Sequence, residues 1–181
     1  MDECEDFAVK KAVIIHQADY SLTRLLHSQP TFGDLNETKN DAVHARQLAR
    51  GFGILEHDII EINDMDIDLI NLKLRELKEE FNKINSQPGN TKRQFLFVYC
   101  AGHGVADQTS YMVLNATSGN LFPIETSLRD LCNGKEMEFL TVFSVYDMCK
   151  DMVSNYPNLT KRVKKQADED ALNVTGRGHG R

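Results

Sequence analysis

Two side chains of this 181-residue chain have the chemistry of a nucleophile and a base, and each follows an apolar run that ends abruptly. Cys149 comes shortly after the run 139–146, and His103 comes shortly after the run 95–101. A free thiol has a pKa of about 8.5 and is mostly protonated at neutral pH, so a nearby imidazole would raise its nucleophilic fraction. The pair therefore predicts covalent catalysis, with Cys149 as the nucleophile and His103 as the general base.

The residues beside this pair fit an acyl-transfer site. His103 has a glycine on each side, which lets backbone approach a substrate closely. The backbone N–H groups of Gly104 and Cys149 would then form an oxyanion hole. In an extended segment, residues two apart point to the same side, so Asp147 would share a face with Cys149.

Each of these residues also has a plain structural interpretation when taken alone. A cysteine at the end of a strand is commonly a small buried hydrophobe, and a histidine in a glycine-rich turn is commonly structural. A zinc site made from Cys100, His103, Cys132 and Cys149 is a further alternative, but the spacing has no familiar ligand knuckle. We therefore interpret Cys100 and Cys132 as core or surface thiols and expect no metal ligands.

The elements that must position these residues alternate between strands and helices. Short β-branched or aromatic runs predict strands, and apolar residues spaced three or four apart predict helices. The strands are expected over 11–15, 57–62, 95–101 and 139–146, a hairpin arm over 111–114, and helices from 40 to 51, 66 to 84 and 124 to 131. This order predicts an α/β fold with three layers and a mainly parallel central sheet, whose chemistry sits beyond the carboxyl ends of the strands.

Composition and charge limit the classes of partner. Hydrophobic residues make up 41% of the chain, which is enough for one globular core, and the formal net charge of -6 argues against a nucleic-acid binder. We find no apolar run of membrane-spanning length and no positively charged leader, so the expected location is cytoplasmic, with no membrane partner. The expected organisation is an extension over 1–7, one domain over 8–156, and a charged, disordered tail over 157–181.

The motifs taken together resemble the caspase-like cysteine peptidases, the group of caspases, metacaspases and paracaspases. Tyr99-Cys-Ala-Gly-His-Gly104 is similar to the strand-end motif that carries the catalytic histidine of this group. Asp147-Met-Cys149 is similar to the D-x-C motif of the nucleophile, in the form closest to paracaspases. The spacing between His103 and Cys149 is close to the roughly 50 residues found in caspases. The resemblance covers about residues 8 to 155, including the strand 11–15 and the segment Asn40-Asp41-Ala42.

This resemblance implies a cysteine-type endopeptidase that cleaves after Arg or Lys through a thioester acyl-enzyme. The Q-A-C-x-G motif of the Asp-specific caspases is absent. In the related branches, aspartates at the positions of Asp147 and Asp41 line the S1 pocket and select a basic side chain. Two carboxylates around a guanidinium are physically reasonable, since bidentate charge-assisted bonds give affinity and orientation. A plain helix cap is the alternative for Asp41.

Family members complete their sheet with further strands after the nucleophile, whereas few apolar residues follow Cys149 here. The resemblance therefore predicts a large-subunit segment that lacks the small-subunit strands and pairs as a homodimer or with a separate small subunit. An incomplete sheet would leave an exposed edge. The alternative function is a catalytically inactive, caspase-like interaction module.

Two further expectations concern cofactors and processing. No cofactor is expected from the residues themselves, and calcium activation is implied only by the metacaspase branch, because the sequence has no recognisable calcium loop. The basic stretch Lys161–Lys165 sits where related enzymes carry an intersubunit linker, so it is either a self-cleavage site or a solvated run of charge.

Overall fold

The computed structural model describes residues 7–22, 32–87, 93–106, 109–115, 121–133, 140–148 and 151–152. Several expectations fall on other positions. Cys149, the stretch Lys161–Lys165 and the tail 157–181 all lie outside the described residues, as do residues 1–6 of the expected N-terminal extension.

The main sheet has four strands, all parallel, in the order β2-β1-β3-β7. They are β1 (Val9–His16), β2 (Ile59–Asn63), β3 (Gln94–Gly102) and β7 (Leu140–Met148). The central strands β1 and β3 are almost wholly buried, as expected for apolar runs that are covered on both faces. The predicted parallel sheet is confirmed.

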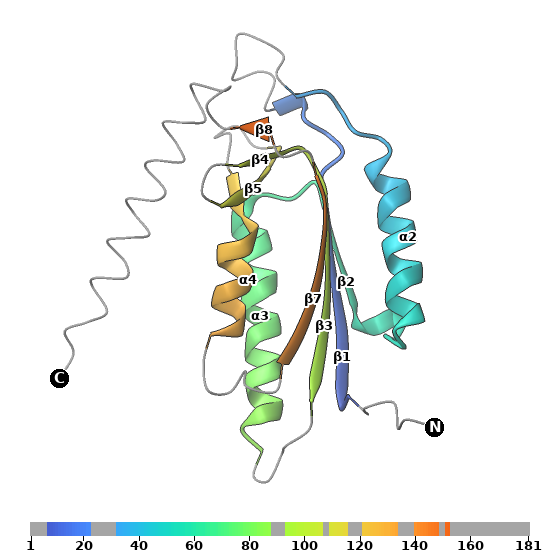
Figure 1. Cartoon of the computed structure of the whole chain (residues 1–181), viewed down its shortest axis with the longest axis vertical. Helices are drawn as coiled ribbons and strands as arrows, with labels where there is room; N and C mark the ends of the chain where they lie inside the picture. Colours follow the sequence, from blue (N-terminus) through green and yellow to red (C-terminus); the bar gives the residue numbers. More distant parts are fainter. Residues whose placement is uncertain are drawn as a thin grey trace, which may run out of the picture.

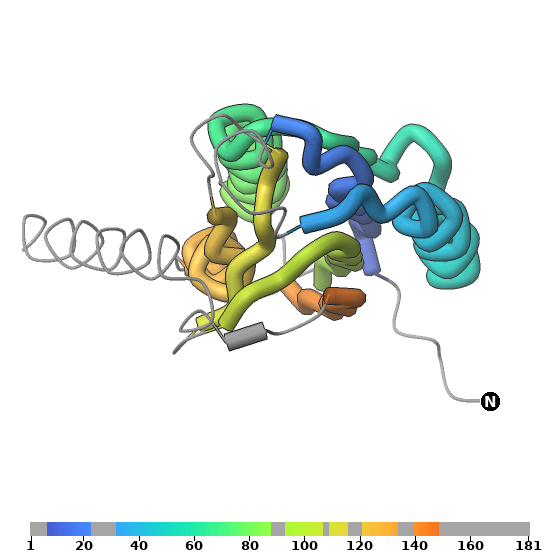
Figure 2. The backbone as a smooth tube through the Cα atoms, turned by 90° about the horizontal axis from the view of Figure 1, so that it is seen from above, coloured from blue at the N-terminus to red at the C-terminus, as the bar shows by residue number. Residues whose placement is uncertain are grey.

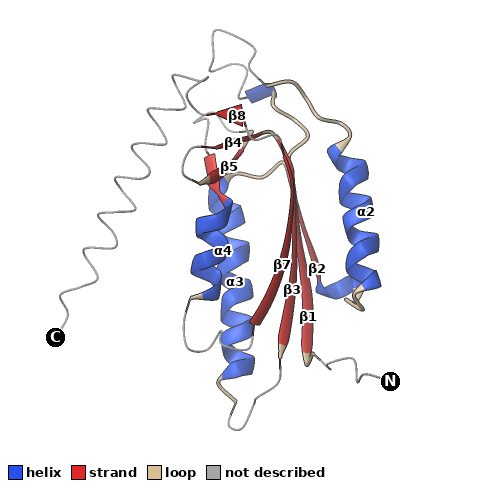
Figure 3. Ribbon diagram, viewed as in Figure 1, coloured by secondary structure: helices blue, strands red, loops and turns tan. Residues whose placement is uncertain are grey.

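Helices cover both faces of this sheet and give the three predicted layers (Figures 1 and 3). Helix α2 (Thr38–Gly51) packs on one face, and α3 (Ile67–Asn85) and α4 (Ile124–Cys132) pack on the other. The view along the strands shows the same division (Figure 2). No helix in the described ranges combines the length and the apolarity that a membrane crossing requires.

The contact between α2 and the sheet is made by small side chains. Ala42, Ala45 and Ala49 form a buried stripe on α2 and pack in one core cluster with Ile14 and Tyr99 of the sheet. Because an alanine ends at its Cβ atom, this stripe lets the helix lie close to the strands.

The opposite face has a core of large aliphatic and aromatic residues. The two helices and the strands supply different members of this cluster. From α3 and α4 come Ile70, Leu74, Leu77, Phe81, Leu128 and Leu131, and from β1 and β3 come Val13, Ile15, Leu96, Val98 and Cys100. Helix α3 begins at a capped end, since Asp66 accepts a hydrogen bond from the N–H of Leu69 at 3.0 Å.

A second, smaller sheet lies at the carboxyl ends of the main strands (Figure 1). Its order is β6-β5-β4-β8, formed by β6 (Leu121–Pro123), β5 (Ser110–Val113), β4 (Gly104–Ala106) and β8 (Asp151–Met152). Strands β4, β5 and β6 are antiparallel, which fits the predicted hairpin arm, whereas β8 runs parallel to β4. One residue, His103, separates the end of β3 in the main sheet from the start of β4 in the small sheet.

Two local predictions are wrong. Residues His57 and Asp58 lie in a short 3-10 helix, η1 (Glu56–Asp58), and the strand begins only at Ile59. Helix α2 begins at Thr38 with Glu37 at its N-cap, so Asp41 lies inside the first turn and is not a cap. The earlier start is stabilised by the Thr38 hydroxyl, which donates to the carbonyl of Leu35 at 2.8 Å.

Candidate active site

His103 is held by the loop that follows β1. Its backbone N–H donates to the hydroxyl oxygen of Tyr20 at 2.8 Å. The imidazole packs edge-on against the Tyr20 ring, with centroids 4.7 Å apart, and against Phe32 at 5.1 Å. Tyr20 and Phe32 are buried in the same small cluster, so they form a rigid wall behind the half-buried histidine.

A backbone carbonyl fixes the tautomer of His103. Its Nε2 lies 2.9 Å from the carbonyl oxygen of Gly33. A carbonyl oxygen only accepts hydrogen bonds, so Nε2 must carry the hydrogen. In the neutral ring the lone pair is then on Nδ1, which makes Nδ1 the basic atom. The same carbonyl also stabilises the imidazolium that forms when Nδ1 takes up a proton.

Gly102 lets Tyr20 approach the histidine. A Cβ atom on this residue would lie 2.7 Å from the Tyr20 hydroxyl oxygen and 3.0 Å from the terminal methyl of Met112. Its backbone φ of +154° is also one that other residues rarely adopt. The glycine that precedes His103 is therefore required by local space as well as by backbone conformation.

Strand pairing brings the two motifs to the same place. In the main sheet Gly102 of β3 pairs with Met148 of β7, and in the small sheet Val105 of β4 pairs with Asp151 of β8. The described residues on either side of position 149 are therefore paired with residues on either side of His103. Cys149 itself is outside the described residues, so its role stays a prediction.

The backbone N–H of Gly104 is directed away from β5. The N–H of Val113 donates to the carbonyl of His103 at 2.9 Å, and Gly104 is the register partner of Met112. Gly104 and Met112 are therefore a non-hydrogen-bonded pair of the antiparallel ladder. In such a pair the backbone N–H and C=O groups of each residue point away from the partner strand. The outward side of β4 is the side of β8.

The two aspartates of the expected S1 pocket both act on one tyrosine. Tyr99 donates its hydroxyl hydrogen to Oδ2 of Asp147 at 3.0 Å. Burial raises the pKa of Tyr99, and the hydrogen bond to Asp147 and the negative charges of Asp147 and Asp41 raise it further. Asp41 lies in the first turn of α2 and Asp147 near the end of β7. The structure thus brings both carboxylates to the same edge of the same sheet face.

The two described cysteines, Cys100 and Cys132, have different surroundings. Cys100 is fully buried, and burial raises the pKa of its thiol to about 12. Cys132 is the last residue of α4, on the face of the sheet opposite Asp41. Among the described residues, His, Cys, Asp and Glu side chains form no group of three or more that could hold a metal ion.

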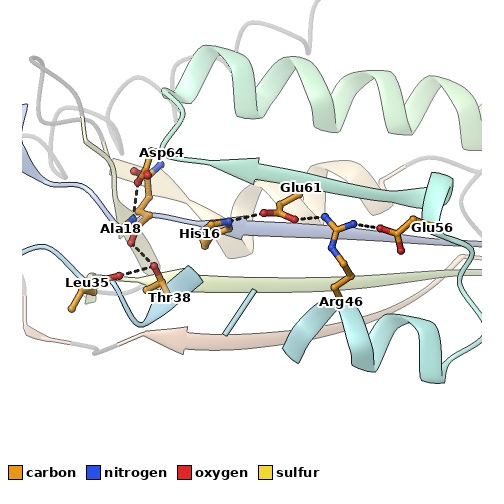
Figure 4. A network of polar contacts seen from close by, with 9 residues as sticks. His16, Ala18, Leu35, Thr38, Arg46, Glu56, Glu61 and Asp64 are labelled. Carbon is orange, nitrogen blue, oxygen red and sulfur yellow. Dashed lines mark hydrogen bonds and ion pairs between the residues drawn. The ribbon is translucent and has the colours of Figure 1, made fainter. Parts of the chain in front are cut away.

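A polar network braces the end of β1 (Figure 4). The buried His16 contacts Oε1 of Glu61 at 3.1 Å, and Arg46 of α2 bonds to both Glu61 and Glu56. The hydrogen bond from Arg46 lowers the pKa of Glu61, against the opposing effect of partial burial, with a smaller contribution from His16. Helix α2 is therefore tied to β1 and β2 by charge as well as by its alanine stripe.

The loop after β1 is fixed by a separate set of bonds. Oδ1 of Asp64 accepts from the N–H groups of Ala18 at 2.6 Å and Asp19 at 3.0 Å. The N–H of Leu35 donates to the carbonyl of Ala18 at 2.8 Å. These contacts hold the loop that carries Tyr20.

Tyr20, Phe32 and Gly33 are parts of this site that the sequence does not predict. No motif marks them, because they lie in loops far along the chain from His103. Tyr99 could have been placed from the sequence, because strand alternation puts it on the same face of β3 as Ala101, the register partner of Asp147.

Comparisons with protein-family models and with curated proteins find no match for this chain.

Proposed function

We propose that the chain is a cysteine-type endopeptidase of caspase-like fold, with Cys149 as the nucleophile and His103 as the general base. The observation that carries this proposal is the strand pairing on either side of position 149, Gly102 with Met148 and Val105 with Asp151. Cys149 directly follows Met148 in the chain, and Met148 pairs with Gly102, the residue before His103. The thiol is therefore attached to the chain within one residue of this pairing.

The tautomer of His103 defines the proton transfers. Nδ1 takes the thiol proton of Cys149, and Sγ attacks the substrate carbonyl carbon. When the tetrahedral intermediate collapses, the C–N bond breaks and Nδ1 gives its proton to the departing amine. Water then attacks the thioester with His103 again as the base, which releases the acid product and the free thiol. Throughout, the Nε2–H bond to Gly33 keeps the ring oriented.

The N–H groups of Gly104 and Cys149 are the proposed oxyanion donors. Support for Gly104 comes from the ladder between β4 and β5, which leaves its N–H directed toward the β8 side of the strand. A fixed N–H at that position can stabilise the negative charge on the oxygen as the sulfur attacks.

The proposed substrates are proteins or peptides with Arg or Lys before the cleaved bond. Support comes from Asp147 and Asp41, whose negative charges both act on Tyr99 at the carboxyl edge of the sheet. Two nearby carboxylates repel each other, and a guanidinium or ammonium between them relieves that repulsion.

A partner that continues the sheet is part of the same proposal, either a second copy or a separate small subunit. In the described part of the chain β7 is one of the two edge strands of the main sheet, and its Phe143 is 46% exposed. Calcium activation is retained as a condition to test.

Fluorogenic peptides with Arg, Lys or Asp before the scissile bond test the function of the full chain, with and without calcium. We expect turnover of the Arg and Lys peptides only, loss of turnover in Cys149→Ala, and unchanged turnover in Cys132→Ala. The absence of turnover, together with no labelling of Cys149 by an arginine chloromethyl ketone, would contradict the proposal and favour an inactive interaction module.

A further inference from the structure

Tyr99 reaches Asp147 along a diagonal of the main sheet. Its register partner on β7 is Val145, and Asp147 lies two residues farther toward the carboxyl edge on the same face. The residue directly opposite Asp147 is Ala101, whose side chain ends at Cβ. The tyrosine ring spans this gap, and its hydroxyl lies 3.0 Å from Oδ2 of Asp147.

The ring of Tyr99 is anchored while Asp147 is exposed. Tyr99 is 8% exposed and packs in the cluster beneath α2. Asp147 has one interaction within the described residues, the bond from Tyr99, and its side chain otherwise faces solvent. An exposed aspartate samples several rotamers about its two side-chain torsions, so a rigid donor selects one of them.

The hydrogen bond from Tyr99 also makes the two oxygens of the Asp147 carboxylate different from each other. Oδ2 uses one of its acceptor sites for the tyrosine, whereas both acceptor sites of Oδ1 stay open to a ligand. Asp41 lies in the first turn of α2, and α2 packs on the same sheet face as Tyr99. A planar guanidinium has enough donors to bond Oδ1 of Asp147 and the Asp41 carboxylate at once.

We propose that Tyr99 is a positioning residue for basic-side-chain recognition, fixing the Asp147 carboxylate so that Oδ1 and Asp41 together receive a guanidinium or amidinium group. This inference rests on the proposed function, because it takes the S1 role of the two aspartates from it. It adds a specificity determinant outside the pair of carboxylates themselves.

A double-mutant cycle on the full chain tests the inference without requiring catalysis. The dissociation constant of 4-aminobenzamidine, a fluorescent amidine, is measured for the wild type, Tyr99→Phe, Asp147→Asn and the double variant. We expect Tyr99→Phe to raise this constant about tenfold, the scale of one lost hydrogen bond to a charged group. In the Asp147→Asn background the same change should have almost no effect, because Tyr99 acts through Asp147.

A matched control removes a hydroxyl from a neighbouring tyrosine on the other sheet face. Tyr146 of β7 packs against the α3 and α4 cluster, and Tyr146→Phe should leave the amidine affinity unchanged. For Arg peptides Tyr99→Phe should raise KM with little change in kcat, since it disturbs binding and not the thiol or the base.

The inference would be overturned if Tyr99→Phe weakened 4-aminobenzamidine binding equally in the wild-type and Asp147→Asn backgrounds. It would also be overturned if Tyr99→Phe did not weaken binding at all. A wild-type chain that does not bind 4-aminobenzamidine would overturn it too. The proposed peptidase activity is judged separately, by labelling of Cys149 and by turnover of peptides. If Tyr99→Phe does not fold, Asp147→Glu serves instead, because its longer arm displaces the carboxylate from the tyrosine. A weakening of 4-aminobenzamidine binding by Asp147→Glu of about tenfold supports the inference, and unchanged affinity of this variant refutes it.

Discussion

The hydroxyl oxygen of Tyr20 lies 2.8 Å from the backbone nitrogen of His103, and the two rings pack edge to face with centroids 4.7 Å apart. The tyrosine therefore holds both the backbone and the side chain of the proposed base. Since Tyr20 is fully buried, its position is set by the core around it and not by solvent.

Replacing Tyr20 by Phe keeps the ring and removes the acceptor for the His103 N–H. We expect a loss of about 1–2 kcal/mol in the free energy of unfolding, because a partly buried donor loses its partner. Peptide turnover should fall as His103 gains freedom. Urea denaturation and the peptide assay measure the two effects, and equal stability and turnover in the variant would show that the bond is dispensable.

Replacing Gly102 by Ala should destabilise the fold. The new methyl would lie 2.7 Å from the Tyr20 hydroxyl oxygen, at a φ of +154° that alanine rarely adopts. We expect a loss of about 2 kcal/mol or more, on the scale of overpacking combined with backbone strain.

Gly51→Ala is the matched control for that change. Apart from its chain neighbours and the backbone of its own helix, no atom lies within 4 Å of its Cβ position, and the residue is the last of α2. Alanine favours the helix by up to about 1 kcal/mol relative to glycine. Thermal unfolding should therefore show a lower midpoint for Gly102→Ala and an unchanged or higher one for Gly51→Ala.

Arg46→Gln should reduce stability at neutral pH and have less effect in acid. Arg46 lowers the pKa of Glu61 in the folded chain. The stabilisation by this pair is therefore fully present above the unfolded pKa of about 4.3 and is lost as the pH falls through the lower folded value. Because both side chains are partly exposed, we expect at most about 1 kcal/mol at pH 7. Urea denaturation from pH 7 to pH 3 measures this, and a pH-independent difference would contradict the pairing.

Alkylation should separate the two described thiols. Iodoacetamide at pH 8 should leave Cys100 unmodified in the folded chain, because it is fully buried and its pKa is raised to about 12. Cys132 is exposed and should react, although partial burial of its thiol raises its pKa and slows the reaction. Peptide mapping before and after addition of urea measures both rates. Rapid modification of Cys100 without urea would show that the α3 and α4 core opens readily.

The sequence predicts the main sheet and its helices because their signals are long and local. The aromatic and β-branched run of β3 and the regular apolar spacing of α3 each extend over many residues. The strands β4, β6 and β8 have two or three residues each, too few to show alternation. These strands form through pairing with neighbours: β4 and β6 pair with β5, and β8 pairs with β4. No local sequence pattern reveals such pairing.

The candidate site was predictable where it depends on strand ends. His103 and Asp147 lie at the carboxyl edge, as expected from their positions after apolar runs. The residues that hold His103 were not predictable, because Gly33 and Tyr20 are 70 and 83 positions away in the chain and reach it through loops. Asp41 looked equally suited to capping, and only the earlier start of α2 at Thr38 excludes that role.

The alanine stripe of α2 acts as a spacer between two layers that each carry a carboxylate, Asp41 on the helix and Asp147 on the sheet. The width of the gap that the proposed basic side chain would bridge is therefore set by methyl groups buried in the core. A wider residue at Ala42, such as valine, would move the start of the helix outward and favour longer cations over compact ones. A substitution in the buried core could then change the preferred size of the cation while Asp41 and Asp147 stay unchanged.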